Sequence, residues 1–178
     1  MYGDDEENTI GSAKMIDRIM TLRNYTRADP GSSSTYVHTR NRSHPDIAVR
    51  FLLHDRRRVG VKDIRQFIED ISEHSHVFFV TNGPLTLYAS RELYAISDVH
   101  VEHWLTSELI QDPTKHRYYC PHRIVSKRRK RQLKTSTLPR ISHKDIICRF
   151  LGARRGNVLE IVRTHPNGFH YVVMRLVV

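Results

Sequence analysis

Hydrophobic and polar positions follow two regular spacings along the first two thirds of the chain. Apolar residues at steps of three and four predict amphipathic helices, and short apolar or alternating runs predict strands. Helices are expected at residues 9–24, 63–72 and 90–96, and strands at residues 46–54, 77–81 and 99–105. The run at 77–81 is continuously apolar, which is typical of a strand buried on both faces. Helices and strands that alternate in this order predict a small α/β layer.

The last forty residues carry the most consistent local signals. Asp145 can cap a helix over residues 146–151, and Gly152 can take the left-handed position after it. Asn167-Gly168 fits a tight turn between two final strands. Both faces of the last strand are largely apolar, so we expect it to be covered on both. Because a two-stranded ribbon is marginal alone, this block is expected to need a partner surface, either the first domain or another protein.

Charge divides the 178 residues into two parts. Residues 1–114 hold 13 Lys/Arg against 17 Asp/Glu, whereas residues 115–178 hold 16 against 2. The sequence QDPTK at 111–115 breaks the helix–strand pattern where this change occurs. We therefore predict an α+β protein with an α/β domain at 1–110 and a smaller α+β domain at 111–178 that ends in a β-hairpin. The basic part should meet polyanions, either nucleic acid or an acidic protein surface.

Composition excludes several classes of protein. No apolar run reaches membrane-spanning length, and the acidic start argues against a secretory or transit segment. Cys120 and Cys148 are the only cysteines. They allow one disulfide on paper but no dense framework, which favours a reducing compartment.

The closing block also carries a pattern of motifs in a fixed order. These are Leu138-Pro139-Arg140-Ile141, Arg149-Phe150-Leu151-Gly152, Arg155-Gly156, Ile161-Val162-Arg163, Tyr171 and Arg175-Leu176-Val177. In order and spacing they closely resemble the C-terminal domain of the common RNA polymerase subunit that is called subunit five in eukaryotes and has a counterpart in archaea. Upstream, His116 and His122 keep the family's six-residue spacing, although Pro121 stands one place later than the family proline.

The resemblance implies the two-domain eukaryotic form. Its N-terminal domain would be a jaw with a restriction-nuclease-like fold near downstream duplex DNA. Its C-terminal domain would dock on the largest polymerase subunit, and the chain would perform no chemistry. Only residues 55–58 stand where the family has a longer insertion, so we expect a reduced jaw. The basic segment SKRRKRQLKTST replaces a longer acidic-to-neutral helix, which indicates a shortened, divergent member of cellular or viral origin.

Candidate sites follow from the resemblance and from charge. Candidate partner contacts are His116, Pro121, His122, Leu138, Pro139, Arg140, Gly152, Arg155, Gly156, Arg163, Tyr171 and Arg175. Candidate DNA contacts are Thr86, Leu87, Tyr88 and Arg91, in a segment that could equally be an ordinary strand-to-helix loop. A basic run, Lys127, Arg128, Arg129, Lys130 and Arg131, is a further contact candidate, although most charge runs are solvated loops.

Two catalytic or metal-binding alternatives are weak. A nuclease of the jaw fold would need Asp or Glu ligands for Mg²⁺ with Glu-x-Lys spacing, and the sequence has no such motif. Zinc at His116, Cys120 and His122, completed by His143 and Cys148, lacks the paired short spacings of structural sites. We expect no enzyme activity, no cofactor, no metal and no homo-oligomer.

The expected partners are the largest subunit, other polymerase subunits and downstream duplex DNA. The expected location is the nucleus for a cellular protein, or the host nucleus, host cytoplasm or virion for a viral one. The alternative function is a free-standing basic DNA- or RNA-binding module.

Overall fold

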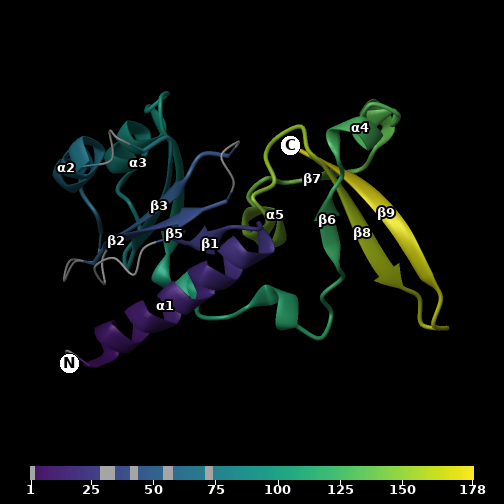
Figure 1. Cartoon of the computed structure of the whole chain (residues 1–178), viewed down its shortest axis with the longest axis horizontal. Helices are drawn as coiled ribbons and strands as arrows, with labels where there is room; N and C mark the ends of the chain where they lie inside the picture. Colours follow the sequence, from purple (N-terminus) through teal and green to yellow (C-terminus); the bar gives the residue numbers. More distant parts are fainter. Residues whose placement is uncertain (1–2, 29–34, 41–43, 54–57, 71–73) are drawn as a thin grey trace. The chain divides into compact units, whose positions relative to one another are not determined.

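The computed structural model describes residues 3–28, 35–40, 44–53, 58–70 and 74–178 (Figure 1). The chain divides into two compact units, Met1–Gln111 and Asp112–Val178, called here the N-terminal and C-terminal units. Each unit combines helices with one mixed β-sheet, so the chain is of the α+β class.

The N-terminal unit is built on a five-stranded sheet of order β1-β2-β3-β4-β5. Its strands are β1 (Thr26–Arg27), β2 (Thr35–Thr39), β3 (Ile47–Leu52), β4 (His76–Thr81) and β5 (His100–Leu105). The first two pairings are antiparallel, and β3, β4 and β5 run parallel. Every residue of β4 is buried, which confirms the prediction of a strand covered on both faces. A continuous apolar run forms such a strand because neither face meets water.

Helices cover the two faces of this sheet (Figure 1). The apolar sides of α2 (Val61–Asp70) and α3 (Leu87–Tyr94) pack on one face, where Ile64 and Leu93 join the cluster that contains Phe79. Helix α1 (Gly3–Leu22) lies on the other face, and Arg23, just after it, sits 4.9 Å from the ring centre of Phe78. Because successive side chains of β4 point to opposite faces, Phe79 packs in the layer with α2 and α3, and Phe78 packs in the layer with α1.

The N-terminal unit departs from the sequence predictions in its boundaries and in its sheet. Helix α1 begins six residues before the predicted start, and α3 begins three residues early. Strands β1 and β2 were not predicted, because they are short and are defined by pairing across the sheet rather than by a local run. The predicted connection at 55–58 lies outside the described residues except for Arg58. A 3₁₀ turn, η1 (Thr106–Leu109), follows β5.

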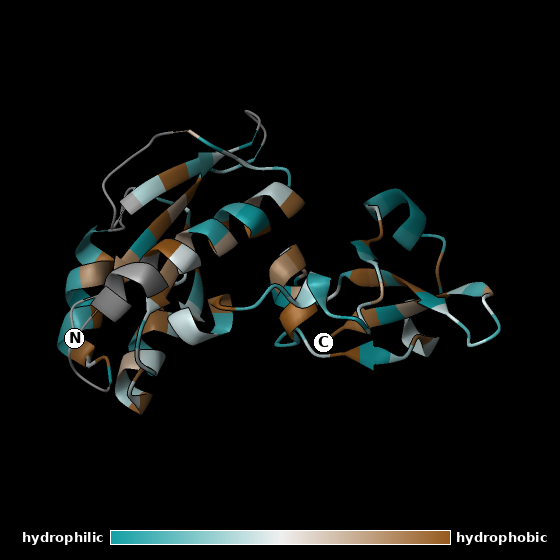
Figure 2. Ribbon diagram, turned by 90° about the horizontal axis from the view of Figure 1, so that it is seen from below, coloured by the Kyte–Doolittle hydropathy of each residue, from teal (hydrophilic) through white to brown (hydrophobic). Residues whose placement is uncertain are grey.

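The C-terminal unit holds a four-stranded sheet of order β6-β8-β9-β7. In chain order its elements are η2 (Pro113–Lys115), β6 (His122–Ile124), α4 (Lys127–Lys130), η3 (Thr135–Thr137), β7 (Arg140–Ile141), α5 (Ile146–Leu151), β8 (Val158–Thr164) and β9 (His170–Val177). Its core gathers Cys148, Leu159, Ile161 and Val177. Figure 2 shows α4 as a uniformly hydrophilic helix.

The local signals of the closing block are confirmed. The Asp145 carboxylate accepts hydrogen bonds from the backbone N–H of Ile147 (2.9 Å) and of Cys148, which caps α5. Gly152 ends this helix at φ 66°, the left-handed region that favours glycine. Gly168 takes φ 89° in the turn between β8 and β9, so the terminal hairpin forms as predicted.

Residues 116–125 are extended only in β6, because the segment before it forms a turn in which the Tyr119 N–H bonds to the His116 carbonyl. The chain itself does not cover the last strand along its whole length: residues 170–172 are exposed, because β7 pairs only with Leu176 and Val177 at its far end. The predicted need for a partner surface stays a prediction. Both cysteines are free thiols. Burial raises the pKa of Cys148 to about 11, which keeps it protonated and unreactive.

No helix in the described part of the chain combines the length and apolar character needed to span a bilayer.

Candidate functional site

A buried charged network ties α1 to the sheet of the N-terminal unit. The Arg23 guanidinium donates to both carboxylate oxygens of Glu102 on β5, with both distances 2.9 Å. His76 on β4 lies 2.8 Å from the same carboxylate. Burial opposes ionisation of Glu102, but the charge of Arg23 and the surrounding hydrogen bonds outweigh it and hold the pKa of this carboxyl well below its usual value.

The same network is the one cluster in the described residues with the geometry of a metal site. Ligand atoms of His76, His100 and Glu102 lie within 4.8 Å of one another. However, Arg23 already donates to both oxygens of Glu102, so a divalent cation would have to displace a guanidinium that is itself buried. Mg²⁺ also prefers oxygen ligands, and this cluster supplies a single carboxylate beside two imidazoles. We therefore assign the network a structural role.

This network predicts a pH dependence of stability. Burial lowers the pKa of His76 despite its hydrogen bond to Glu102, and burial lowers the pKa of His38 in the same way. Below the ordinary histidine value of 6.5 the unfolded chain binds protons that the folded unit does not, so stability should fall as pH drops from about 6.5 toward 5. His76→Gln should flatten this slope when unfolding is followed by pH-dependent urea titration.

The matched control is His44→Gln, at an exposed position of the same unit. It should leave the slope unchanged. An unchanged slope in His76→Gln as well would show that His76 does not govern this pH dependence.

The histidines considered as zinc ligands make other hydrogen bonds. The Nδ1 atom of His116 accepts a hydrogen bond from the Tyr118 N–H, and the Nδ1 atom of His122 bonds with the Cys120 carbonyl. His143 bonds through Nδ1 to the Val178 carbonyl. Among the described residues, no group with metal-ligand geometry includes any of these side chains.

The candidate DNA contacts lie at the start of α3. Thr86 is the N-cap of this helix, and its hydroxyl accepts a hydrogen bond from the Ala89 N–H at 3.2 Å. Thr86 is therefore first a structural residue. Leu87 and Tyr88 are 64% and 69% exposed, and Arg91 is exposed one turn further along the helix. The structure thus leaves three of the four candidates available to a partner.

Several partner candidates of the C-terminal unit meet in one open cleft. The cleft has a volume of about 320 Å³, and His116, His122 and Arg163 line it together with Tyr118 and Tyr119. The Nε atom of Arg163 is buried and has no hydrogen-bond partner among the described residues. An arginine donor within an aromatic cleft suits a carbonyl or carboxylate of a partner. The two tyrosines were not predicted, although adjacent aromatic residues beside a family motif were an available signal.

The Leu138–Ile141 motif has a clear structural use. Pro139 precedes β7, and its carbonyl accepts a hydrogen bond from the Leu176 N–H at 2.8 Å. Arg140 pairs with Leu176 in the ladder between β7 and β9. Gly156, at φ 86°, is held by a hydrogen bond from its N–H to the Val177 carbonyl. These candidates therefore build the end of the hairpin that lies beside β7, far from its turn. Only exposed side chains such as Arg140 remain for a partner.

The turn end of the β8–β9 hairpin is apolar and exposed. Phe169 is 72% exposed, Val172 is 53% and Tyr171 is 45% exposed. Large apolar side chains gathered on one exposed ribbon are typical of a protein-interaction surface. Of these three residues the sequence predicted only Tyr171, because exposure depends on where β7 stops and not on the residues themselves.

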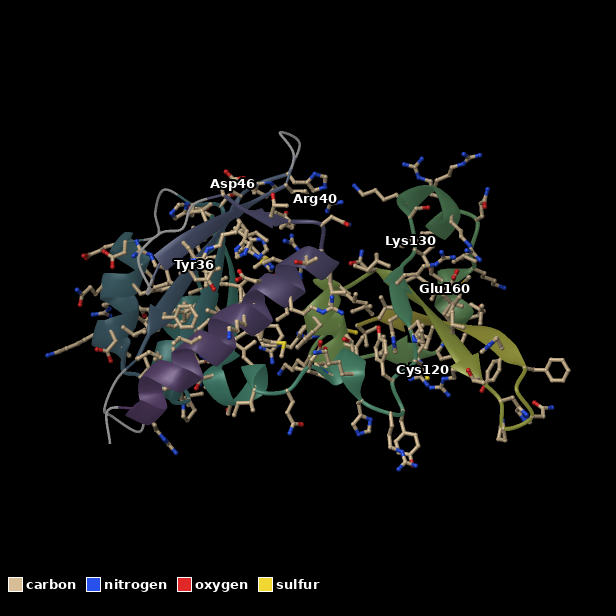
Figure 3. The ribbon with its side chains drawn as sticks, turned by 60° about the horizontal axis from the view of Figure 1, so that its bottom comes forward. Tyr36, Arg40, Asp46, Cys120, Lys130 and Glu160 are labelled. Carbon is tan, nitrogen blue, oxygen red and sulfur yellow. The ribbon has the colours of Figure 1, made fainter. Side chains whose placement is uncertain are left out.

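The basic run forms the one-turn helix α4, not a loop. The Ser126 hydroxyl accepts a hydrogen bond from the Arg129 N–H and caps the helix. Glu160 on β8 is 4% exposed and lies 2.7 Å from Arg129 and 2.5 Å from Arg123. Figure 3 labels Glu160 on β8 and Lys130 on α4. No local signal in the sequence indicated Glu160, because its partners are more than thirty residues away.

A family of known proteins matches the C-terminal unit. Residues 111–177 match the family described as RNA polymerase Rpb5, C-terminal domain. The C-terminal unit is therefore similar to the C-terminal domain of the Rpb5 family. The match coincides with the compact C-terminal unit and includes the cleft, the hairpin and α4.

Relatives extend the similarity beyond the matched domain. The chain is 29% identical over 130 residues to "DNA-directed RNA polymerases I, II, and III subunit RPABC1" of Caenorhabditis elegans and of Caenorhabditis briggsae, which covers 68% of this chain and 62% of each relative. The corresponding subunit of Dictyostelium discoideum is 27% identical over 145 residues, which covers 75% of this chain and 74% of the relative. The chain thus spans less than two thirds of the length of the worm proteins.

Proposed function

We propose that this chain is a non-catalytic subunit of a multisubunit DNA-directed RNA polymerase and acts in transcription. The observation that carries the proposal is the match of residues 111–177 to the Rpb5 C-terminal domain, since this unit also bears the uncovered hairpin. A structural role agrees with the N-terminal unit, where the single carboxylate of the buried network is already paired with Arg23.

The C-terminal unit docks on the largest polymerase subunit. The turn end of the hairpin supplies apolar contact through Phe169, Tyr171 and Val172. Arg163 in the cleft supplies a buried hydrogen-bond donor. Interfaces typically combine a few such aromatic and arginine anchors with a polar rim. One copy of the chain binds per polymerase.

Cross-linking of lysines in the purified assembly tests this docking. Lys134 and Lys144 are exposed, and they lie before and after β7 in the chain. They should cross-link to the largest subunit. Cross-links to that subunit confined to Lys14 and Lys62 of the N-terminal unit would contradict docking through the C-terminal unit.

The N-terminal unit forms a reduced, restriction-nuclease-like jaw beside downstream duplex DNA. Tyr88 and Arg91 on α3 contact phosphates there, in a sequence-independent way. A cellular protein of this kind acts in the nucleus, and a viral one acts where the virus transcribes.

Tyr88→Ala combined with Arg91→Ala should weaken retention of downstream DNA by the assembled polymerase about 3- to 10-fold, because the change removes one charged phosphate contact and one aromatic contact. Polymerase assembly should be unchanged. The measurement is the salt concentration that releases duplex DNA from the purified enzyme.

The matched control for this variant is Tyr94→Ala with Arg65→Ala, which removes another exposed tyrosine and arginine from α3 and the neighbouring α2. Thr86 is kept, because its loss would remove the cap of α3. Equal DNA release by both double variants would exclude the start of α3 as a specific contact.

The alternative function is a free-standing basic DNA- or RNA-binding module. The excess of lysine and arginine in residues 115–178 favours this alternative. Such a module would be recovered from cells by itself, whereas a polymerase subunit would be recovered together with the large polymerase chains.

A further inference from the structure

We infer that α4 and the neighbouring turn at residues 154–157 form a binding site for the phosphodiester backbone of nucleic acid. This basic patch consists of Lys127, Arg128 and Arg131 around α4 and of Arg154 and Arg155 in the turn. The site is distinct from the proposed DNA contacts of the N-terminal unit, and it does not depend on docking to a polymerase.

Helix α4 has a fixed position. A four-residue helix is not stable by itself in water, so tertiary contacts must hold it. The Ser126 cap closes its first turn, and the buried Glu160 carboxylate pairs with Arg129 from α4 and with Arg123 from β6. Arg123 and Glu160 are also direct partners in the ladder between β6 and β8. The basic helix is thus anchored to the sheet.

This anchoring uses only part of the positive charge. Arg123 and Arg129 neutralise Glu160, whereas Lys127, Arg128 and Arg131 are exposed. Lys130 turns toward the second segment, since a Cβ built on Gly156 would lie 3.9 Å from its Nζ atom. The turn that carries Arg154 and Arg155 therefore lies beside α4. Two segments more than twenty residues apart contribute to one charged surface.

The C-terminal unit holds almost no compensating acid. From residue 115 onward the acidic residues are Asp145 and Glu160. Asp145 caps α5, and Glu160 is occupied by the two arginines. A surface with several exposed cations, whose neighbouring carboxylate Glu160 is buried and already paired, attracts polyanions, and a polyanion releases its condensed counterions when it binds there.

Nucleic acid fits this surface better than an acidic protein does. Protein interfaces generally contain a buried apolar or aromatic anchor at their centre. Every residue from 126 to 132 is polar or charged. The exposed apolar residues at the turn end of the hairpin are not part of this basic patch. A purely polar, cationic surface matches the repeated phosphates of a nucleic-acid backbone, which it would contact without reading sequence.

The test uses the full-length chain and fluorescence anisotropy with labelled probes. One probe is a duplex DNA of about 25 base pairs and the other is a single-stranded RNA of about 25 nucleotides, each titrated over a series of salt concentrations. The patch variant is Arg128→Glu with Arg131→Glu. The control variant is Lys115→Glu with Arg117→Glu, which changes the net charge equally at exposed positions near the cleft.

We expect the patch variant to bind at least one probe about 10-fold or more weakly and to reduce the slope of log affinity against log salt by about two, while the control changes affinity less than about 3-fold. Loss on duplex DNA identifies DNA as the ligand, and loss on the RNA alone identifies RNA; either result supports the site. Arg128→Gln with Arg131→Gln serves as a second variant if the charge reversal fails to fold.

Equal weakening by the patch and control variants would overturn the inference, since it would mean diffuse attraction to net charge. A polyglutamate peptide that binds as tightly as nucleic acid and is lost in the same patch variant would overturn it in favour of an acidic protein partner. The absence of measurable binding by the unsubstituted chain at low salt would also overturn it. The proposed polymerase role fails by a different result, namely loss of association with the large polymerase chains.

Discussion

Glu102→Gln should lower the free energy of unfolding of the N-terminal unit by about 3–5 kcal/mol, the range found when one partner of a buried ion pair is removed. Arg23 is 6% exposed at its side chain and donates to both oxygens of Glu102. A neutral amide can replace only one of these acceptors, which leaves a guanidinium buried without a counter-charge. Because this network joins α1 to β5, its loss should loosen the whole face of the sheet.

The chain's single tryptophan makes this measurement specific to one unit. Trp104 is fully buried in the N-terminal unit, where its ring stacks on Phe78 at 5.9 Å. Its fluorescence during urea unfolding therefore reports this unit without the C-terminal one. The control is Glu92→Gln, which removes a partner of the exposed pair with Arg65 and should change stability by less than about 0.5 kcal/mol. Equal stability losses in the two variants would contradict a buried, stabilising network.

The second large effect concerns docking. Tyr171→Asp combined with Val172→Asp should reduce association with polymerase at least about 10-fold, because anchors of this kind each contribute on the order of 2 kcal/mol to an interface. Both side chains are about half exposed at the turn end of the hairpin, so the unit itself should remain folded. The readout is the amount of the full-length variant that coprecipitates with the largest subunit.

The control for docking is Tyr94→Asp in the N-terminal unit, which removes another exposed tyrosine. It should leave association unchanged. Full association of the hairpin variant would show that the polymerase binds a different surface.

Local chemistry explains which parts of the fold could be predicted. The cap at Asp145, the left-handed glycine at 152 and the Asn167-Gly168 turn act over a few residues, so their pattern alone predicted α5 and the hairpin. The continuous apolar run of β4 likewise predicted a fully buried strand.

Long-range pairing explains most of what could not be predicted. Strand β2 is defined by its partners in β3, and the Arg23–Glu102 pair joins residues 79 positions apart. The anchoring of α4 by Glu160 is similar, since a charge run gives no indication of a distant buried carboxylate. For the candidate sites, the motifs supplied candidate residues. The structure separates Thr86 and Gly156, which have structural roles in a helix cap and a turn, from exposed residues such as Tyr88 and Tyr171.

Quantitative copurification tests most directly whether the chain is a polymerase subunit. The tagged full-length chain is recovered from its native cells, treated with nuclease to remove bridging nucleic acid, and washed at about 0.5 M salt, where exposed charge–charge contacts are largely screened. Mass spectrometry then measures the ratio of this chain to the largest polymerase subunit. A polymerase subunit predicts a ratio close to one, maintained through the wash. Recovery of the chain by itself, without the large polymerase chains, would contradict this role.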